Sequence, residues 1–174
     1  SLNNYVPVIL DPLFYSGLIA LALAILLTIA RLFISLMYRV GPLEPISLGT
    51  INASLLFVLA GLCFVIAGAQ LADSSVDDVF FENLFWGGGH VLQFVNVGLM
   101  ITAWYLLGGL ALQMPVVKPN HLGLAQIFLL FSAVLAPLIY VFSEAFEFSQ
   151  NSAFTLLQYA FVPPTLLVVF LGLR

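Results

Sequence analysis

The sequence predicts an all-α integral membrane protein, a polytopic bundle of five transmembrane helices with its N-terminus outside and its C-terminus in the cytoplasm. Of the 174 residues, 63% are hydrophobic and 7% are charged, whereas a soluble domain carries roughly 25% charged residues. The mean hydropathy is +1.16. The few charges stand between long apolar runs rather than along one face of each helix, which indicates that the surrounding solvent is lipid.

Five runs are long and apolar enough to cross a bilayer, which takes about 20 residues of helix. The first is uncharged up to Ala30 and can continue past Arg31 if that side chain snorkels to the interface. The second is uncharged throughout, and the third lies in the charge-free stretch between Glu82 and Lys118. The predicted spans, which form a single transmembrane domain over residues 1–174, are residues 13–37, 46–72, 85–112, 122–143 and 153–173.

Helix-breaking residues fit this division. Residues 41–45 (GPLEP) and 115–120 (PVVKPN) are short connections, so we expect neighbouring spans to form antiparallel hairpins. Pro137 lies inside the fourth span, and Pro163 and Pro164 lie inside the fifth. Because helices in lipid tolerate proline where neighbours satisfy the freed carbonyl groups, we expect kinks at these prolines.

The distribution of charge predicts the orientation. Five alternating spans place every Lys and Arg on one side and every carboxylate except Glu44 on the other. The basic residues are Arg31, Arg39, Lys118 and Arg174, and the acidic residues opposite them are Asp11, Asp73, Asp77, Asp78, Glu82, Glu144 and Glu147. The positive-inside rule assigns the basic side to the cytoplasm.

Composition also limits the partners. Four Lys and Arg residues cannot form a surface that follows phosphates, so we expect no nucleic acid partner. We expect the lipid bilayer and other transmembrane helices, of the same or partner chains, as partners in a bacterial inner membrane. The chain starts at Ser1 rather than Met. We therefore expect either that residues were removed or that the chain is a piece of a longer protein.

The start of the third span carries the candidate site. Residues 82–96 read ENLFWGGGHVLQFVN, and His90 is the only histidine inside a predicted span. Its helical face also carries Glu82, Trp86 and Phe94, with Gln93 and Asn96 at adjoining positions. A neutral imidazole there could ligate a metal. Three glycines before it lower helix propensity by about 1 kcal/mol each, so we expect a neighbouring helix or a flat group to pack against them.

A simpler interpretation is open. In this interpretation His90 is a packing residue that hydrogen-bonds a neighbouring helix, while the glycines allow close approach. Trp86 near the outer end of the span also fits the aromatic belt at the membrane interface.

The pattern Phe85-Trp86-x-x-Gly89-His90 resembles the start of the sixth helix in the catalytic subunit of the haem-copper oxidases, the cytochrome c oxidase subunit I-like family. The resemblance implies that the five spans correspond to the family's helices four to eight. It also implies terminal electron transfer to oxygen, with haem and copper as cofactors. In that family the motif's histidine ligates copper beside the high-spin haem. The resemblance therefore makes His90 a candidate copper ligand and places Trp86, Gly89, Gln93 and Phe94 near the cofactor.

The chain departs from the family's pattern in two places. Many members have a tyrosine four residues after the motif's histidine, where this chain has Phe94, although some branches carry that tyrosine elsewhere. The family's next helix ends in a histidine pair that completes the copper site, whereas residues 139–144 (IYVFSE) contain no histidine. His121 is predicted to lie in the cytoplasmic loop, roughly a membrane thickness from His90. The copper site is therefore incomplete, and this chain alone is expected to be inactive.

Two carboxylates near the end of the fourth span are candidate proton carriers or cation ligands. Glu144 and Glu147 are spaced i, i+3, which puts them on one face of a helix. The alternative is that they are solvated loop charges that help to set the topology.

Three hypotheses follow for the function. The first is that the chain is part of a haem-copper oxidase catalytic subunit, and the second is that it is a non-catalytic relative with the same fold. The third is an unrelated small membrane subunit, a transporter or assembly component, whose glycines and His90 mediate helix contacts or substrate passage.

Overall fold

The computed structural model describes residue 9 and residues 11–172, apart from the side chain of Asp78, and it divides into two compact units, Ser1–Leu43 and Glu44–Arg174. All regular structure among the described residues is helical, and five helices or helix pairs there are long and apolar enough to cross a membrane. The predicted all-α class with five candidate membrane helices is confirmed at that level. Arg174, predicted to be cytoplasmic, lies outside the described residues.

The first unit contains α1 (Pro12–Met37). Asp11 caps its N-terminus, because the Asp11 carboxylate accepts a hydrogen bond from the Leu13 amide at 2.7 Å. Pro12 suits the first helical position, because proline has no N–H that would need a partner there. The hydroxyl groups of Thr28 and Ser35 donate to carbonyl oxygens four residues earlier. These two hydroxyl groups are therefore satisfied within the helix itself.

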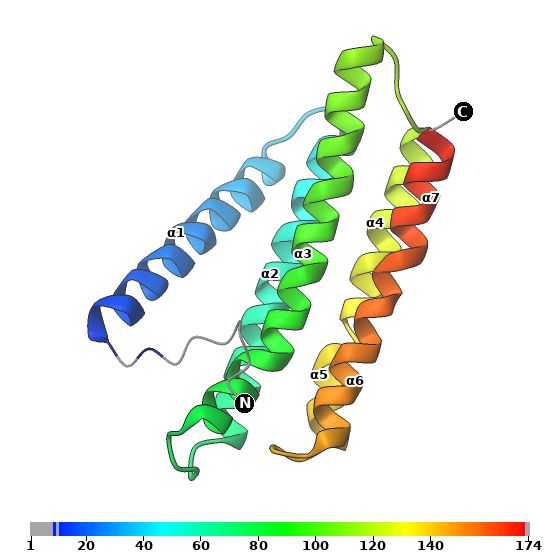
Figure 1. The fold of residues 1–174 in the computed structure, drawn as a ribbon. Coiled ribbons are helices and arrows are strands. Elements are labelled where there is room, and N and C mark those ends of the chain that lie inside the picture. The colour runs from blue at the N-terminus through cyan, green and yellow to red at the C-terminus, as the bar shows by residue number, and fades with distance from the viewer. Residues whose placement is uncertain (1–8, 10, 173–174) are drawn as a thin grey trace. The chain divides into compact units, whose positions relative to one another are not determined.

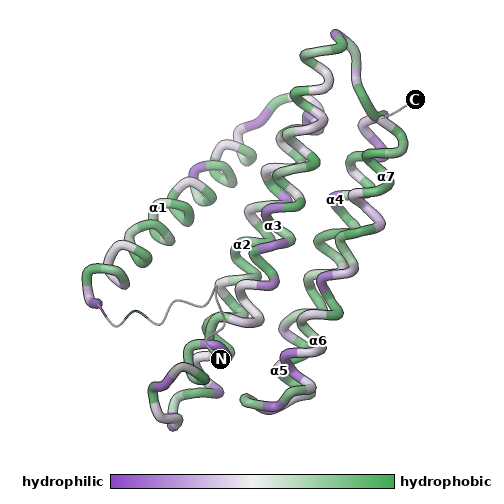
Figure 2. The backbone as a smooth tube through the Cα atoms, in the orientation of Figure 1, coloured by the Kyte–Doolittle hydropathy of each residue, from purple (hydrophilic) through white to green (hydrophobic). Residues whose placement is uncertain are grey.

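The second unit is a bundle of four membrane-length segments. Its helices are α2 (Pro45–Gln70), α3 (Asp78–Leu112), α4 (Pro119–Ala133), α5 (Ala136–Phe142), α6 (Phe148–Gln158), the 3₁₀ turn η1 (Tyr159–Phe161) and α7 (Val162–Gly172). The helix α2 runs antiparallel beside α3, and the α4–α5 segment runs beside the α6–α7 segment (Figure 1). Most positions along the helices are hydrophobic, and a few positions inside α3 are hydrophilic (Figure 2).

The third membrane helix begins earlier than predicted, at Asp78 rather than residue 85. Asp77 is its N-cap, and the Asp77 carboxylate accepts a hydrogen bond from the Phe80 amide at 2.8 Å. Glu82 is therefore helical. Capping chemistry decides this boundary, whereas the prediction was based on hydropathy.

Both proline sites interrupt their helices as expected. The α4 helix ends at Ala133, four residues before Pro137, and α5 begins at Ala136. In the last segment, η1 covers the turn that precedes Pro163 and Pro164. Proline lacks the N–H that would bond to the carbonyl four residues earlier and its ring clashes with that carbonyl, so the break falls just before each proline.

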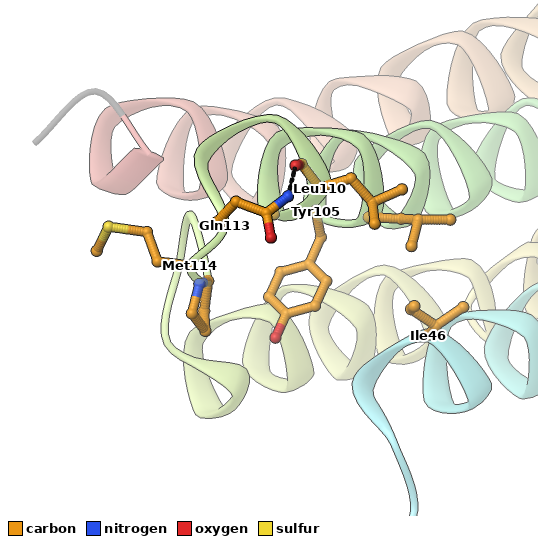
Figure 3. A pocket seen from close by; sticks show the side chains of 8 residues that line it. Ile46, Tyr105, Leu110, Gln113 and Met114 are labelled. Atoms are coloured by element: carbon orange, nitrogen blue, oxygen red, sulfur yellow. Dashed lines mark hydrogen bonds between the residues drawn. The ribbon is translucent and has the colours of Figure 1, made fainter.

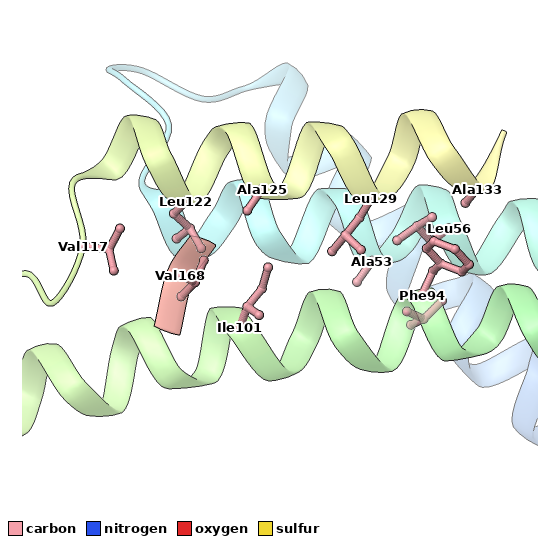
Figure 4. Packing of buried hydrophobic residues seen from close by; sticks show 11 residues of the cluster. Ala53, Leu56, Phe94, Ile101, Val117, Leu122, Ala125, Leu129, Ala133 and Val168 are labelled. Atoms are coloured by element: carbon pink, nitrogen blue, oxygen red, sulfur yellow. The ribbon is translucent and has the colours of Figure 1, made fainter. Parts of the chain in front are cut away.

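The core of the second unit lies between α2, α3, α4 and α7 (Figure 4). Leu56, Ile101 and Leu129 are fully buried there and come from α2, α3 and α4. Val168 of α7 joins the same cluster, and so does Val117 from the α3–α4 connection.

A buried polar network crosses this core. The Asn52 amide of α2 donates to Gln126 Oε1 of α4 at 2.6 Å. The Gln126 amide in turn donates to the Gly98 carbonyl at 3.0 Å and to the Thr102 hydroxyl at 2.9 Å, both on α3. Polar groups in hydrocarbon need such internal partners. The network therefore fixes the mutual register of three helices.

Candidate functional site

His90 lies in the interior of the second unit, in the part of α3 toward its N-terminus. The residue is 5% exposed, and its Nδ1 atom lies 2.6 Å from the Trp86 carbonyl oxygen, one turn earlier. A carbonyl can only accept, so Nδ1 carries the proton and Nε2 keeps its lone pair. The predicted candidate is thus a buried neutral imidazole with one nitrogen free to accept a hydrogen bond or a metal.

Two aromatic rings flank this imidazole. The Trp86 ring centroid lies 4.9 Å from that of His90, and the Phe154 centroid of α6 lies 6.3 Å away. The Trp86 indole N–H donates to the Asn151 carbonyl of α6 at 3.1 Å. Trp86 is therefore tied to a neighbouring helix, and it holds the imidazole through its own carbonyl.

The three glycines before His90 have different surroundings. A Cβ atom on Gly87 would overlap the Tyr140 hydroxyl and would come within 2.6 Å of Phe154 Cζ. A Cβ atom on Gly88 would overlap the Phe64 ring of α2, whereas nothing lies within 4 Å of one on Gly89. The expected close packing of a neighbour against bare backbone thus holds for the first two glycines and not for Gly89.

Tyr140 of α5 is a site residue that the sequence analysis missed. It is 4% exposed, its hydroxyl is buried without a hydrogen-bond partner among the described residues, and its ring centroid lies 4.9 Å from that of Phe154. Cys63 of α2 belongs to the same buried cluster. The sequence signal for this residue is a hydroxyl within an otherwise apolar span.

The other predicted neighbours of His90 do not form one group. Phe94 is fully buried and packs edge-to-face against Phe161, with ring centroids 5.7 Å apart. Gln93 accepts a hydrogen bond from the Gln158 amide of α6. Asn96 is exposed on the outer surface of α3. Asn96 is therefore not part of the buried surroundings of His90.

The predicted helical face shared by Glu144 and Glu147 is also wrong. Both residues are exposed and lie between α5, which ends at Phe142, and α6, which begins at Phe148. One oxygen of Glu147 accepts hydrogen bonds from the Glu144 amide and, at 2.8 Å, from the Ser149 hydroxyl. Both residues thus stand in the connection before α6, where Glu147 occupies the N-cap position without a side-chain cap bond, and their role as proton carriers stays a prediction.

His121 lies in the first turn of α4 rather than in a loop, as its N–H bonds to the Lys118 carbonyl at 2.9 Å. Pro119 at the first helical position starts this helix three residues before the predicted span.

The donor set around His90 is small. Among residues 9 and 11–172, no group of three or more His, Cys, Asp and Glu side chains is placed to hold a metal ion. The site consists of the His90 imidazole, the Tyr140 phenol and the aromatic rings around them. The Nε2 atom of His90 can bind a polar group there, but it is the single strong metal ligand of the site.

Two curated proteins are similar to part of this chain. An uncharacterized protein of Aquifex aeolicus (strain VF5) is 36% identical over 108 residues, which is 60% of this chain and 27% of that protein. An uncharacterized protein of Rickettsia prowazekii (strain Madrid E) is 27% identical over 112 residues, 60% of this chain and 21% of that protein. The match thus spans about a quarter of the length of these relatives. No family model and no solved structure matches the chain.

Proposed function

We propose that this chain is a membrane-embedded part of a haem-copper oxidase-like respiratory protein, in which His90 supplies one imidazole ligand to the oxygen-reducing metal centre. The observation that carries the proposal is the state of His90. It is buried in the bundle and its Nδ1 proton bonds to the Trp86 carbonyl at 2.6 Å. Histidines that bind metals almost always donate their other ring N–H to a carbonyl, carboxylate or water, which orients the ring and fixes the tautomer.

Tyr140 supports the same proposal. The family resemblance implies a phenol near the motif's histidine, and the motif position itself holds Phe94. Tyr140 packs against Gly87, and the Phe154 ring contacts both Tyr140 and His90. A buried hydroxyl without a partner costs about 1–3 kcal/mol. A group that uses this hydroxyl as a donor would remove that cost.

The residues of this chain alone do not fit a copper site or a haem site. In the part of the chain that the structure describes, His90 does not belong to any group of three or more His, Cys, Asp and Glu side chains that could hold a metal ion. Further ligands would have to come from other segments or partner chains. The chain by itself is then inactive, and its role is to present one imidazole in a dry, aromatic setting.

The orientation belongs to the same proposal. The Gln70 amide at the end of α2 donates to the Ser143 carbonyl at 3.3 Å, and the Phe146 amide donates to Asn83 Oδ1 near the start of α3 at 3.1 Å. The turns with Glu144 and Glu147 thus gather at one end of the second unit, and Lys118 lies between α3 and α4 at the other end. We assign the Lys118 end to the cytoplasm of a bacterial inner membrane, with the N-terminus of the chain outside.

One observation favours a non-catalytic relative of the same fold as the second candidate. The described neighbours of His90 and Gly87 are closely packed side chains of the chain itself, so His90 can also serve as a packing residue. In that case His90→Ala weakens the bundle but changes no electron-transfer activity.

Replacing His90 distinguishes the two. The whole protein, purified from its native membrane, is compared with His90→Ala and with His121→Ala, which alters the histidine in the first turn of α4. We expect His90→Ala to change the visible absorption spectrum and to abolish oxygen reduction, while His121→Ala retains both. A folded His90→Ala protein with unchanged spectrum and activity would overturn the proposal.

A further inference from the structure

A pocket lies at the turn between α3 and α4, far along α3 from His90 (Figure 3). It is an open hollow of about 350 Å³, within the size range of small-molecule sites. Most of its wall is apolar. The lining residues are Ile46, Tyr105, Leu106, Gly109, Leu110, Gln113, Met114 and Pro115.

Two polar groups are available in this apolar wall. The hydroxyl of Tyr105 has no hydrogen bond to any described residue, and Figure 3 shows its ring pointing away from α3 into the space beside the turn. The Gln113 amide nitrogen donates to the Leu110 carbonyl at 2.7 Å, which leaves the Gln113 side-chain oxygen as an acceptor. The pocket therefore combines an apolar wall with one donor and one acceptor.

The pocket lies near the membrane surface. The α3 helix has 35 residues and is therefore about 52 Å long, whereas the hydrocarbon core is about 30 Å thick. The pocket residues of α3 belong to its last two turns, and Met114 and Pro115 follow its end. The apolar wall therefore faces the acyl region, and the turn reaches the headgroups.

A cation lies next to the pocket. Lys118 follows Pro115 by three residues, so their Cα atoms are at most about 11 Å apart. Lys118 is also the N-cap of α4, where the helix dipole is positive. A positive side chain at a positive helix end favours an anion there.

We propose that this pocket binds a phospholipid with an anionic headgroup, such as phosphatidylglycerol. One acyl chain lies against Ile46, Leu106 and Leu110, and the phosphate lies at Lys118. The Tyr105 hydroxyl donates to an ester carbonyl of the lipid. The site thus combines an apolar wall, a hydrogen-bonding pair and an adjacent positive charge, which match the acyl chain, ester carbonyl and phosphate of such a lipid.

Gly109 allows a specific test. A Cβ atom there would lie 3.7 Å from the Met114 carbonyl oxygen, an ordinary contact, so the backbone accepts a side chain and Gly109→Leu adds one at the wall of the pocket. Gly61→Leu on α2 is the matched control, because nothing lies within 4 Å of a Cβ atom at that position. Lys118→Gln removes the charge and keeps most of the side-chain length.

The experiment counts lipids. The whole protein is reconstituted in nanodiscs of phosphatidylglycerol and phosphatidylcholine, and the lipids retained after detergent extraction are counted by native mass spectrometry. We expect the unchanged protein and Gly61→Leu to retain one phosphatidylglycerol more than Gly109→Leu and Lys118→Gln. Equal retention of phosphatidylglycerol in all four proteins overturns the proposal, and so does retention of phosphatidylcholine in its place.

Discussion

The packing of Gly87 gives the sharpest test of the site's geometry. In Gly87→Ala the new methyl group would lie 2.6 Å and 2.8 Å from two carbons of the Phe154 ring and would overlap the Tyr140 hydroxyl. Carbon atoms pack at about 3.5–4.0 Å, so both rings must move by roughly 1 Å. Overpacking of this kind costs about 1–3 kcal/mol.

Gly89→Ala is the control for this substitution. Both changes replace glycine by alanine in the same turn of α3, so each gains about 1 kcal/mol of helix propensity. Nothing lies within 4 Å of a Cβ atom on Gly89. The propensity terms cancel in the comparison, and we expect Gly87→Ala to be less stable than Gly89→Ala by about 1–3 kcal/mol.

The assay is reversible unfolding of the purified protein in mixed detergent micelles, followed by circular dichroism. A second variant isolates the phenol, because Tyr140→Phe in the Gly87→Ala background removes the overlapping hydroxyl and should recover part of the loss. If the two alanine variants agree within about 0.5 kcal/mol, as ordinary surface changes do, then Tyr140 and Phe154 do not pack on Gly87 and the described site is wrong.

Three further predictions follow from the structure. Asn52→Leu and Gln126→Leu each leave the other buried amide without its partner, so each should lower the free energy of unfolding by about 1–3 kcal/mol in the same assay. The double variant should lose less than the sum of the two single losses, and additive losses would show that the two amides are not paired. In this chain alone, Tyr140→Phe removes a buried hydroxyl that has no partner among the described residues, so it should leave stability unchanged or raise it by about 1–3 kcal/mol; a loss of stability there would mean that the hydroxyl is already satisfied within the chain. In a Cys63→Ser background, a membrane-impermeant maleimide should label Glu147→Cys but not Lys118→Cys in intact cells, and the reverse pattern would invert the proposed orientation.

Hydropathy and proline were sufficient to predict the helices, because both act within a single segment. An apolar run of about 20 residues without charge is typical of a membrane helix, and the breaks near Pro137 and Pro163 follow from local stereochemistry. The start of α3 was placed too late, since Asp77 signals a helix start by capping rather than by hydropathy.

Contacts between helices were harder to predict. Periodicity put His90 on a face with Trp86, and the structure joins them through the Trp86 carbonyl. It could not show that α5 brings Tyr140 onto Gly87, because that depends on the rotation and register of a second helix. The Asn52–Gln126 pair was missed for the same reason: each amide is an isolated polar residue in its own span, and 74 positions separate them.

The optical absorption spectrum of the whole protein, purified undegraded from its native membrane, tests the proposed function most directly. We expect a haem Soret band that changes when His90 is replaced by alanine and stays the same when His121 is replaced by alanine. A full-length, folded protein without a Soret band would contradict the assignment of His90 to a haem-copper centre.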